Sequence, residues 1–507
     1  MADSEYSADV IVVGGGGSGL AAAIEARALG RSVIVLEKAD AVGGTTGRSV
    51  GSIAATGTPH QIREGIKDSP ADHFADMPLF AAKWGKRPDN EALRRLLTDN
   101  VPETLRWLMG MGVVFYGPLE EPPHRRPRMH NVLPTSRAYV HFLRKRALRV
   151  GVDIRLRTRA ERFVVEDGRV TGVVCEAAGR KQRFTARGAV VLTTGDYTAN
   201  PELKARYISE KISRIQAINP NSTGDGHTMA FELGAEVRNG DVLPLFTRFL
   251  APTRKKLVQR LPPWRIIGLL INWSMRNVPA GILRPFVMDF LTTFLAPSAK
   301  LISASVLVSS EGNVVRDDRG DLVSALVDLP DHSVFLVFDE QVARAFRAWP
   351  NFVSTAPGIG YAYLQDYRRS RRDIFFSAGS VRELAHKIRV PADRLEAQLA
   401  ALAADGGKGL ANGPLYALGP VKMLLTLADG GLAVSDRLEV LDREGAPIPG
   451  LYAAGSVGQG GLFLEGHGHH LGWAFTSGRL AGRHAANDAV SPPAAQGADR
   501  AAADGGA

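Results

Sequence analysis

The sequence of 507 residues contains only one cysteine, Cys175. One cysteine cannot form an intramolecular disulfide, and such low usage is typical of a reducing compartment, so we expect a cytoplasmic protein. No basic segment followed by an apolar run stands at the start, which reads MADSEYSAD, so no secretory signal is predicted. No apolar run is long enough, and free enough of charge and proline, to cross a bilayer.

The sequence is also short of acidic residues in one region. Residues 245–300 hold nine Lys or Arg against a single acid, Asp289, a net charge of +8 out of the +10 of the whole chain. These cations alternate with apolar runs such as WRIIGLLINW, a pattern that favours a helix lying on an anionic membrane surface over a nucleic-acid site. A packed lid with a basic outer face would have the same composition. We therefore expect no nucleic-acid partner, and peripheral contact of residues 250–300 with the inner face of the cytoplasmic membrane stays a hypothesis.

Residues 9–37 have the order of strand, glycine-rich turn, helix and strand that defines a βαβ unit. Gly14, Gly16 and Gly19 follow the pattern G-x-G-x-x-G: the first allows a tight turn, the second lets a pyrophosphate approach, and the third lets the helix pack closely on the strand. Glu37 ends the second strand, where a carboxylate can bind ribose hydroxyls. The unit predicts a dinucleotide site at a helix N-terminus.

The segment after Glu37, KADAVGGTTGRSVGS, resembles the FAD-dependent oxidoreductase 2 family, which includes fumarate reductase flavoproteins and 3-ketosteroid dehydrogenases. Four later segments resemble that family in the same order: GVDIRLRTRAERFVVEDGRVTGV, ARGAVVLTTGDYTANPEL, NPNSTGDGHTMAFELGAEV and PIPGLYAAGSVGQGG. The resemblance implies FAD, bound noncovalently because GGTTGRSVGS has no histidine to carry it. The cofactor-binding residues that it implies are Gly14, Gly16, Gly17, Ser18, Gly19, Glu37, Lys38, Gly43, Gly44, Thr45, Thr46, Ser49, Gly51, Ala160, Thr194, Gly195, Asp225, Gly455 and Gly472.

The resemblance also implies an α/β fold, in which a discontinuous Rossmann-like FAD-binding domain carries an inserted α+β substrate or capping domain. We expect the FAD domain over residues 1–235 and 420–490, and the inserted domain over residues 236–419. The low-complexity residues 491–507 predict a disordered tail. Because no second G-x-G-x-x-G follows a strand, the electrons must be exchanged with a separate donor or acceptor, such as a quinone.

Residues near the C-terminus bear on the substrate. Fumarate reductases of this family clamp a dicarboxylate with histidine and arginine, but these residues are missing from all three expected places, and Glu465 stands near one expected arginine. The segment EGHGHHLGWAFTSGR resembles instead the ketosteroid dehydrogenase ending, whose glycine-rich turn binds a substrate carbonyl, here Gly466, His467 and Gly468. The tyrosine that precedes this turn in those enzymes is absent.

We therefore expect an FAD-dependent oxidoreductase that forms or removes a C=C bond beside a carbonyl in a lipophilic substrate such as a 3-ketosteroid, by hydride transfer with flavin N5. Reduction of a polar enoate, or electron transfer without C=C chemistry, are the alternatives. The candidate acids or bases, each of which could equally have a packing role, are His469, His470, Tyr116, Tyr363 and His130. His467 and His469, at i and i+2 with no further ligand at zinc spacing, predict no metal site.

Overall fold

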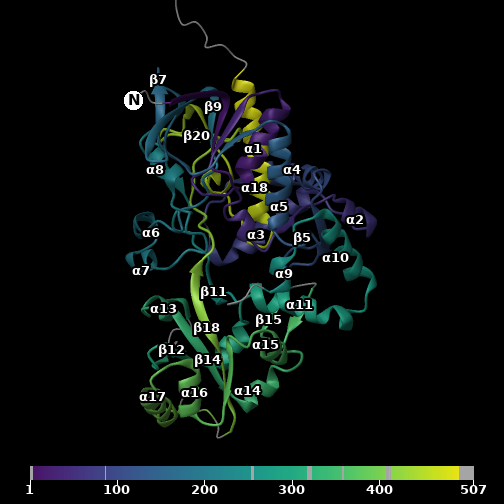
Figure 1. Cartoon of the computed structure of the whole chain (residues 1–507), viewed down its shortest axis with the longest axis vertical. Coiled ribbons are helices and arrows are strands. Elements are labelled where there is room, and N and C mark those ends of the chain that lie inside the picture. Colours follow the sequence, from purple (N-terminus) through teal and green to yellow (C-terminus); the bar gives the residue numbers. More distant parts are fainter. Residues whose placement is uncertain are drawn as a thin grey trace, which may run out of the picture.

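A computed structural model describes residues 4–85, 87–252, 256–316, 322–356, 359–406, 410 and 413–489, and the predicted disordered tail, residues 491–507, lies outside this range. The chain forms two units, one above the other in Figure 1. The upper unit combines N-terminal with C-terminal segments, and the lower unit is built from the middle of the chain. This arrangement confirms the predicted α/β class with a discontinuous nucleotide-binding part.

The upper unit is built on a sheet with the strand order β20-β21-β9-β1-β2-β6. Its members are β1 (Ser4–Val13), β2 (Val33–Leu36), β6 (Asp153–Arg155), β9 (Arg180–Leu192), β20 (Glu439–Leu441) and β21 (Pro447–Ala453). Strand β1 runs parallel to β2 and β9, and its residues Val10, Ile11 and Val12 have no exposed surface. Burial on both faces explains why this strand is an uninterrupted apolar run. Strands β7 (Thr158–Glu166) and β8 (Arg169–Ala177) form an antiparallel hairpin that pairs with β9.

Two helices, α1 (Gly17–Ala28) and α18 (His469–Asp488), pack closely against each other beside this sheet (Figure 1). A Cβ added at Gly478 would lie 2.3 Å from Ser18 O, and one at Gly482 would lie 2.2 Å from Ala22 O, so both positions require glycine. Arg479 Nε also donates to the buried Glu25 carboxylate at 3.0 Å. Helix α18 is thereby fixed against α1, the helix that follows the glycine turn.

The lower unit has a second, antiparallel sheet with helices around it, which makes it α+β. Its strands are β11 (Leu245–Phe249), β12 (Val306–Ser309), β13 (Val314–Val315), β14 (Ser333–Asp339), β17 (Phe375–Ala378) and β18 (Leu415–Leu425). Helices α15 (Leu364–Ser370), α16 (Val381–Ile388) and α17 (Ala392–Ala404) accompany them. Strand β18 continues past the predicted boundary at residue 419, while β10 (Val237–Arg238) pairs with β19 (Gly431–Leu432) outside this sheet. We therefore propose that the inserted unit spans about residues 245–425.

A small sheet of β3 (Ser52–Ala54), β5 (Met129–Leu133) and β4 (Val114–Leu119) links the two units. Helix α10 (Arg265–Asn277) of the inserted segment packs on β4 and β5, and Gly268 allows the close approach, because a Cβ there would lie 3.0 Å from Val114 Cβ. Helix α11 (Ala280–Phe294) follows it. Among the described residues, no helix is both long and apolar enough to cross a membrane.

Candidate active site

A polar cavity lies where β1 ends and α1 begins. The predicted cofactor residues that line it are Gly14, Gly16, Gly17, Ser18, Glu37, Lys38, Gly44, Thr45, Thr46, Ala160, Thr194, Gly195, Asp225 and Gly455. Sequence reasoning missed other polar lining residues: Thr158, Arg159, Thr193, Asn219, Asn221, Ser222 and Ser456. They stand on β7, on loops and on the short 3-10 helix Gly455–Gly458, within the segments that resemble the family and near residues that were predicted.

Three features of this cavity are those expected where a dinucleotide binds. A Cβ added at Gly16 or at Gly195 would meet no atom within 4 Å, so the backbone at both positions borders open space. Gly16 is the N-cap of α1 and has no capping side chain, which leaves the N–H groups of the first turn able to bind a phosphate. The hydroxyl of Thr194 is buried in the wall of the cavity without a hydrogen-bond partner. Such an atom is expected where a bound group supplies the partner.

Charged side chains are fixed at the rim of the cavity. Glu37 accepts hydrogen bonds from the backbone N–H groups of Gly15 at 2.7 Å and Ala39 at 2.9 Å, so its carboxylate is held at the end of β2. Asp225 pairs with Lys38 at 2.6 Å and with Arg159 at 3.0 Å. Burial alone would raise the pKa of Asp225, but the hydrogen bonds and charges of the two cations lower it overall. Asp225 is therefore an anion near neutral pH.

Five of the predicted cofactor residues do not line this cavity. At Gly472 a Cβ would make only ordinary contacts, the nearest at 3.4 Å from Val101 Cγ2. A Cβ would press on neighbouring atoms at the other three glycines: Gly19 (1.9 Å from Gly14 O), Gly43 (2.9 Å from Val140 Cγ2) and Gly51 (2.4 Å from Val132 Cγ1). These glycines are needed for packing, which their type alone does not distinguish from ligand contact. The fifth residue, Ser49, lines a different cavity.

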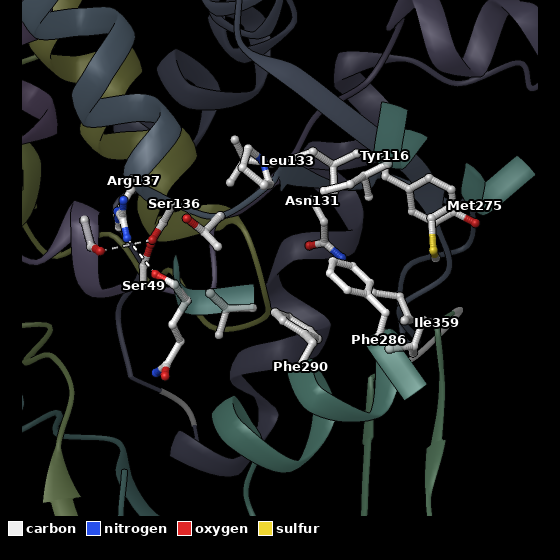
Figure 2. Close-up of a pocket in the computed structure, with 18 of the residues that line it drawn as sticks. Ser49, Tyr116, Asn131, Leu133, Ser136, Arg137, Met275, Phe286, Phe290 and Ile359 are labelled. Atoms are coloured by element: carbon white, nitrogen blue, oxygen red, sulfur yellow. Dashed lines mark hydrogen bonds between the residues drawn. The ribbon is translucent and has the colours of Figure 1, made fainter. Parts of the chain in front are cut away.

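That second cavity is apolar, has a volume of about 480 Å³ and lies between the two units (Figure 2). Residues 47–50 form one wall, directly after the residues Gly44, Thr45 and Thr46 that border the polar cavity. Residues 131–137 and helices α10 and α11 form the other walls, through Ile271, Met275, Phe286, Val287 and Phe290. One short segment, residues 44–50, thus contributes to both cavities.

The two predicted tyrosines lie near this second cavity. Tyr116 lines it, with the guanidinium of Arg276 5.8 Å from the ring centre. Tyr363 lines only a neighbouring hollow, which it shares with Tyr116, and the guanidinium of Arg284 lies 5.6 Å from its ring centre. Of the two phenols, Tyr116 is therefore the one that lines the same cavity as residues 47–50, at the end near Met275 (Figure 2).

The predicted catalytic residue His130 lies in the interior of β5. It has no exposed surface, and its two ring nitrogens contact Thr58 Oγ1 at 2.9 Å and Arg128 O at 2.7 Å. Burial lowers the pKa of His130 to about 3. Because both nitrogens are engaged and the ring lines neither cavity, this geometry favours a packing role.

The glycine-rich turn before α18 directs its histidines to different places. Gly466 and Gly468 have φ values of +92° and +98°, a region that L-residues with side chains rarely adopt. His467 contacts the Glu121 carboxylate through Nδ1 and its backbone N–H, and the ring contact raises the pKa of His467. His470 Nε2 lies 2.9 Å from Asp429 Oδ1.

His469 points into the interior, where its Nδ1 lies 2.5 Å from Glu465 O and its Nε2 lies 3.0 Å from His73 Nε2. Residues 466–470 line neither of the two cavities. Sequence reasoning missed the partners Glu121, Asp429 and His73, since residues so far apart in the chain give no local pattern.

The sheet, the glycine turn and the polar cavity define a dinucleotide-binding oxidoreductase of the Rossmann type. Residues 9–262 and 295–464 match the family described as FAD binding domain, so the chain belongs to this family of FAD-dependent oxidoreductases and FAD is its cofactor.

Relatives and solved structures agree with this assignment. The chain is 25% identical to the probable fumarate reductase Ifc3 of Shewanella frigidimarina, over 95% of this chain and 75% of that one. It is 26% identical to a vinyl phenol reductase of Lactiplantibacillus plantarum, over 95% of this chain and 96% of that one. A similar solved structure is the 3-ketosteroid-delta4-(5alpha)-dehydrogenase from Rhodococcus jostii RHA1 in complex with 4-androstene-3,17-dione. It is 25% identical and has a TM-score of 0.59, and the match covers 95% of this chain and 97% of that one.

Proposed function

We propose that the protein reduces a C=C bond conjugated to a carbonyl in a lipophilic molecule, or forms such a bond by removing hydrogen from the two carbons. FAD, when bound, supplies or accepts the hydride. The observation that carries the proposal is the apolar cavity of about 480 Å³ that shares segment 44–50 with the polar cavity. Its volume falls within the range of about 300–1,000 Å³ typical of small-molecule sites. A substrate there would lie beside the cofactor and away from water.

The polarity of the cavity suggests how the substrate is oriented. Ser49, Ser136 and Arg137 lie at one end, and Met275, Phe286 and Ile359 lie toward the other (Figure 2). Ser136 Oγ donates to Gly47 O at 3.2 Å, and Arg137 Nη1 donates to Gln259 O at 2.7 Å, so these groups are held in place. We infer that the substrate carbonyl binds at the polar end and the hydrocarbon body packs on the aromatic rings.

Tyr116 is the proposed proton donor or acceptor. It is the phenol that borders the same cavity as residues 47–50, and the guanidinium of Arg276 lies 5.8 Å from its ring centre. A phenol can deliver a proton to one carbon as a hydride reaches the next, or remove that proton in the opposite direction. His470, paired with Asp429, is the second candidate.

The relatives support C=C chemistry, although the molecules in their names differ in polarity. Vinyl phenol and 4-androstene-3,17-dione, which the names of two of them contain, are neutral molecules without a carboxylate. Fumarate, in the name of the third, is a dicarboxylate. The apolar cavity favours the neutral class for this chain.

A polar enoate stays the alternative substrate because of Arg248 on β11. This residue belongs to the inserted unit, and burial lowers the pKa of its guanidinium. Its charge also acts on His467 and opposes the effect of Glu121 on the pKa of that ring. Arg248 is therefore the residue of the inserted unit that could bind a carboxylate beside the glycine-rich turn.

The outer face of α10 supports docking on a membrane surface. Ile266, Leu269, Leu270 and Trp273, at i, i+3, i+4 and i+7, form an apolar stripe whose members are 45–63% exposed. The opposite face, with Ile271 and Met275, lines the apolar cavity.

One basic charge near α10 is offset inside the fold, because Arg284 pairs with Asp366. Lys256 donates to Ser370 O and Arg248 is half-buried, while Arg254 and Lys255 lie outside the described residues. We propose that the apolar stripe inserts into the membrane surface and that a lipid-dissolved substrate enters beneath α10. The electron partner would then be a quinone or another separate carrier.

Stopped-flow reoxidation tests this function. Photoreduced holoenzyme is mixed with fumarate, with a vinyl phenol or with a 3-keto-4-ene steroid, and the flavin absorbance is followed. The proposal requires rapid reoxidation by the 3-keto-4-ene steroid and slow reoxidation by fumarate. Reoxidation by the vinyl phenol alone would show C=C reduction without the proposed carbonyl. Reoxidation by fumarate alone would support the polar alternative, and reoxidation only by a quinone would indicate electron transfer without C=C chemistry.

A further inference from the structure

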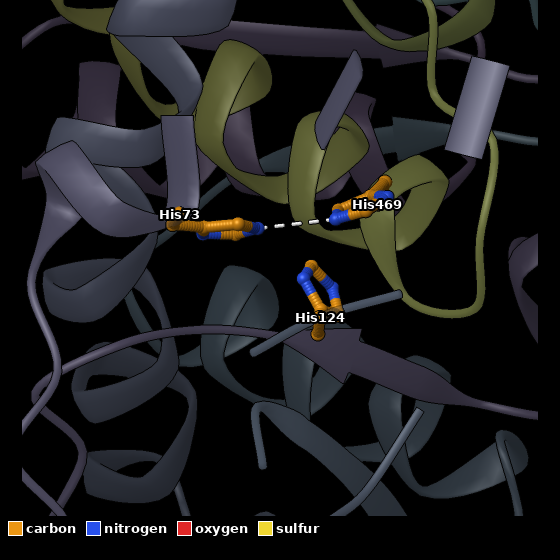
Figure 3. Close-up of side chains that lie close together, drawn as sticks. All are labelled: His73, His124 and His469. Atoms are coloured by element: carbon orange, nitrogen blue, oxygen red, sulfur yellow. Dashed lines mark hydrogen bonds between the residues drawn. The ribbon is translucent and has the colours of Figure 1, made fainter. Parts of the chain in front are cut away.

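Three histidines from distant parts of the chain meet in the interior of the upper unit (Figure 3). His73 lies on α3 (Pro70–Phe80), His124 lies between β4 and β5, and His469 begins α18. One ring nitrogen from each lies within 4.8 Å of those from the other two, and the Nε2 atoms of His73 and His469 are 3.0 Å apart. All three residues are at most 8% exposed, and none lines the cavities described above.

The hydrogen bonds of His469 direct a lone pair into this cluster. Its Nδ1 can only donate to the carbonyl of Glu465, so the Nε2 of the neutral ring carries no proton and faces His73. A histidine that donates one N–H to a backbone carbonyl and offers its other nitrogen is the arrangement found in metal-binding sites.

Other polar atoms of the cluster lack partners. His73 Nδ1 and His124 Nε2 are buried without a hydrogen bond, and so is Glu121 Oε2. The Glu121 carboxylate is close enough to His469 to act on the pKa of that ring. Buried polar atoms are normally paired, so the unpaired His124 Nε2 is an atom for which a bound group would supply the partner. The Glu121 carboxylate would offset a positive charge there.

The cluster is also shielded and neutral. The Phe80 ring centre lies 4.6 Å from that of His124 and 5.5 Å from that of His469. Burial lowers the pKa of His73 well below its usual value, that of His124 to about 2, and that of His469 to about 4. Neutral imidazoles are the form that binds metals, and imidazole suits zinc and similar divalent ions.

We propose that His73, His124 and His469 bind a divalent transition-metal ion, with Zn²⁺ the best fit, through one ring nitrogen each. Tetrahedral zinc at about 2.0–2.1 Å from each nitrogen leaves a fourth position for water. Arg128 Nη1 now donates to His124 Nδ1 at 2.9 Å, which puts the ring proton on Nε2. If His124 binds through Nε2, that proton moves to Nδ1, so Arg128 loses its hydrogen bond to the ring and retains its ion pairs with Asp68 and Asp76. The proton that His73 Nε2 now donates to His469 Nε2 likewise moves to His73 Nδ1, and both Nε2 atoms then face the ion.

The ion would hold α3, the β4–β5 connection and the start of α18 together. His469 follows directly on the glycine-rich turn of residues 466–468, whose backbone has no other tie to α3 among the hydrogen bonds described. The proposed role of the site is therefore structural and independent of the substrate. It can be tested separately from the proposed function.

Metal analysis of the FAD-loaded, tag-free protein tests the proposal. After dialysis against a chelator, Zn²⁺ is titrated by calorimetry and bound zinc is counted by mass spectrometry, with an expected result of one ion per chain. H73N and H124N should weaken binding by more than the roughly 10–100-fold that loss of an outer-shell partner costs. H386N, at an exposed histidine of α16, is the matched control and should bind as the unsubstituted chain does.

Failure of the unsubstituted holoenzyme to bind zinc would overturn the proposal, and so would equal binding by the variants. X-ray absorption at the zinc edge of the unsubstituted protein gives an independent reading if a variant fails to fold. Three imidazole ligands are expected, and a shell without imidazole would contradict the site.

Discussion

His470 Nε2 lies 2.9 Å from Asp429 Oδ1, and the Asp429 side chain is completely buried. The other oxygen of Asp429 has no hydrogen-bond partner. A buried carboxylate that contacts one nitrogen of a histidine fixes both the tautomer and the orientation of the ring, as in many acid/base pairs. The two residues therefore form a unit, whatever substrate the enzyme uses.

Substitution of either member should have the same effect on turnover. We expect H470Q and D429N each to lower kcat with little change in FAD content, and the double variant to be no slower than the slower single variant, because residues that act as a unit are not additive. Steady-state kinetics on the substrate found by stopped flow measures this. D436N, at an exposed acid, is the control, and additive losses would contradict the pair.

Two neighbouring glycines should respond in opposite ways. G16V should fold normally but lose FAD, because the new side chain enters open space that the cofactor needs. G19A should destabilise the protein itself, because its Cβ would lie 1.9 Å from Gly14 O. Flavin absorbance after purification and thermal unfolding without added FAD separate the two effects. Full FAD retention by G16V would show that the cofactor does not bind at this turn.

Stability should fall as the pH decreases below 6.5. Burial lowers the pKa of His130 to about 3 and that of His227 to about 4, so the folded state stays neutral where the unfolded state takes up protons. The unfolded state then binds more protons, and each such histidine costs up to about 1.4 kcal/mol of stability per pH unit between 6.5 and its folded pKa. Urea unfolding between pH 7.5 and 4.5 measures the slope.

A variant at one of these histidines makes this pH prediction specific. The slope should be shallower in H227Q, because glutamine does not titrate. The variant should still fold, since glutamine can donate to Gly430 O, which His227 Nε2 contacts at 3.0 Å. An unchanged slope in H227Q would show that this histidine does not contribute.

Membrane binding should depend on the α10 stripe. W273S should lower flotation with anionic vesicles by roughly tenfold, since burying a large apolar side chain is worth about 1.5–3 kcal/mol. W349S, at a tryptophan of similar exposure that does not belong to α10, should float like the unsubstituted chain. Equal losses in both variants, or no flotation of the unsubstituted chain, would rule out docking through α10.

Tyr116 should affect chemistry more than binding. Y116F keeps the ring in the wall of the apolar cavity and removes only the hydroxyl, so kcat should fall by about 10²–10⁴-fold while KM changes little. Y363F serves as the comparison, because Tyr363 lies outside the cavity that contains residues 47–50. A larger loss in Y363F would reverse this assignment.

Local patterns were sufficient for the nucleotide-binding part of the fold. The apolar run of β1, the glycine turn and Glu37 lie within about 30 residues of one another, and hydrophobic burial and turn geometry act over that distance. The hairpin at residues 166–169 was predictable for the same reason: Asp167 and Gly168 have the positive φ values that such a turn requires. The G-x-G-x-x-G spacing predicted the packing role of Gly19, but glycine type alone did not separate the open space at Gly16 from packing at Gly51.

The sequence by itself determined the class of cofactor and the α/β fold, because those depend on spacings that a single segment contains. Only the tertiary structure decided which distant side chains meet. His73 and His469 are 396 residues apart in the chain, yet their nitrogens lie 3.0 Å from each other, because the packing of α18 against α1 brings both ends of the chain into one core. The apolar cavity beside residues 44–50 also depends on tertiary packing, since its other walls come from residues 131–137 and from helices of the inserted unit that carry no motif.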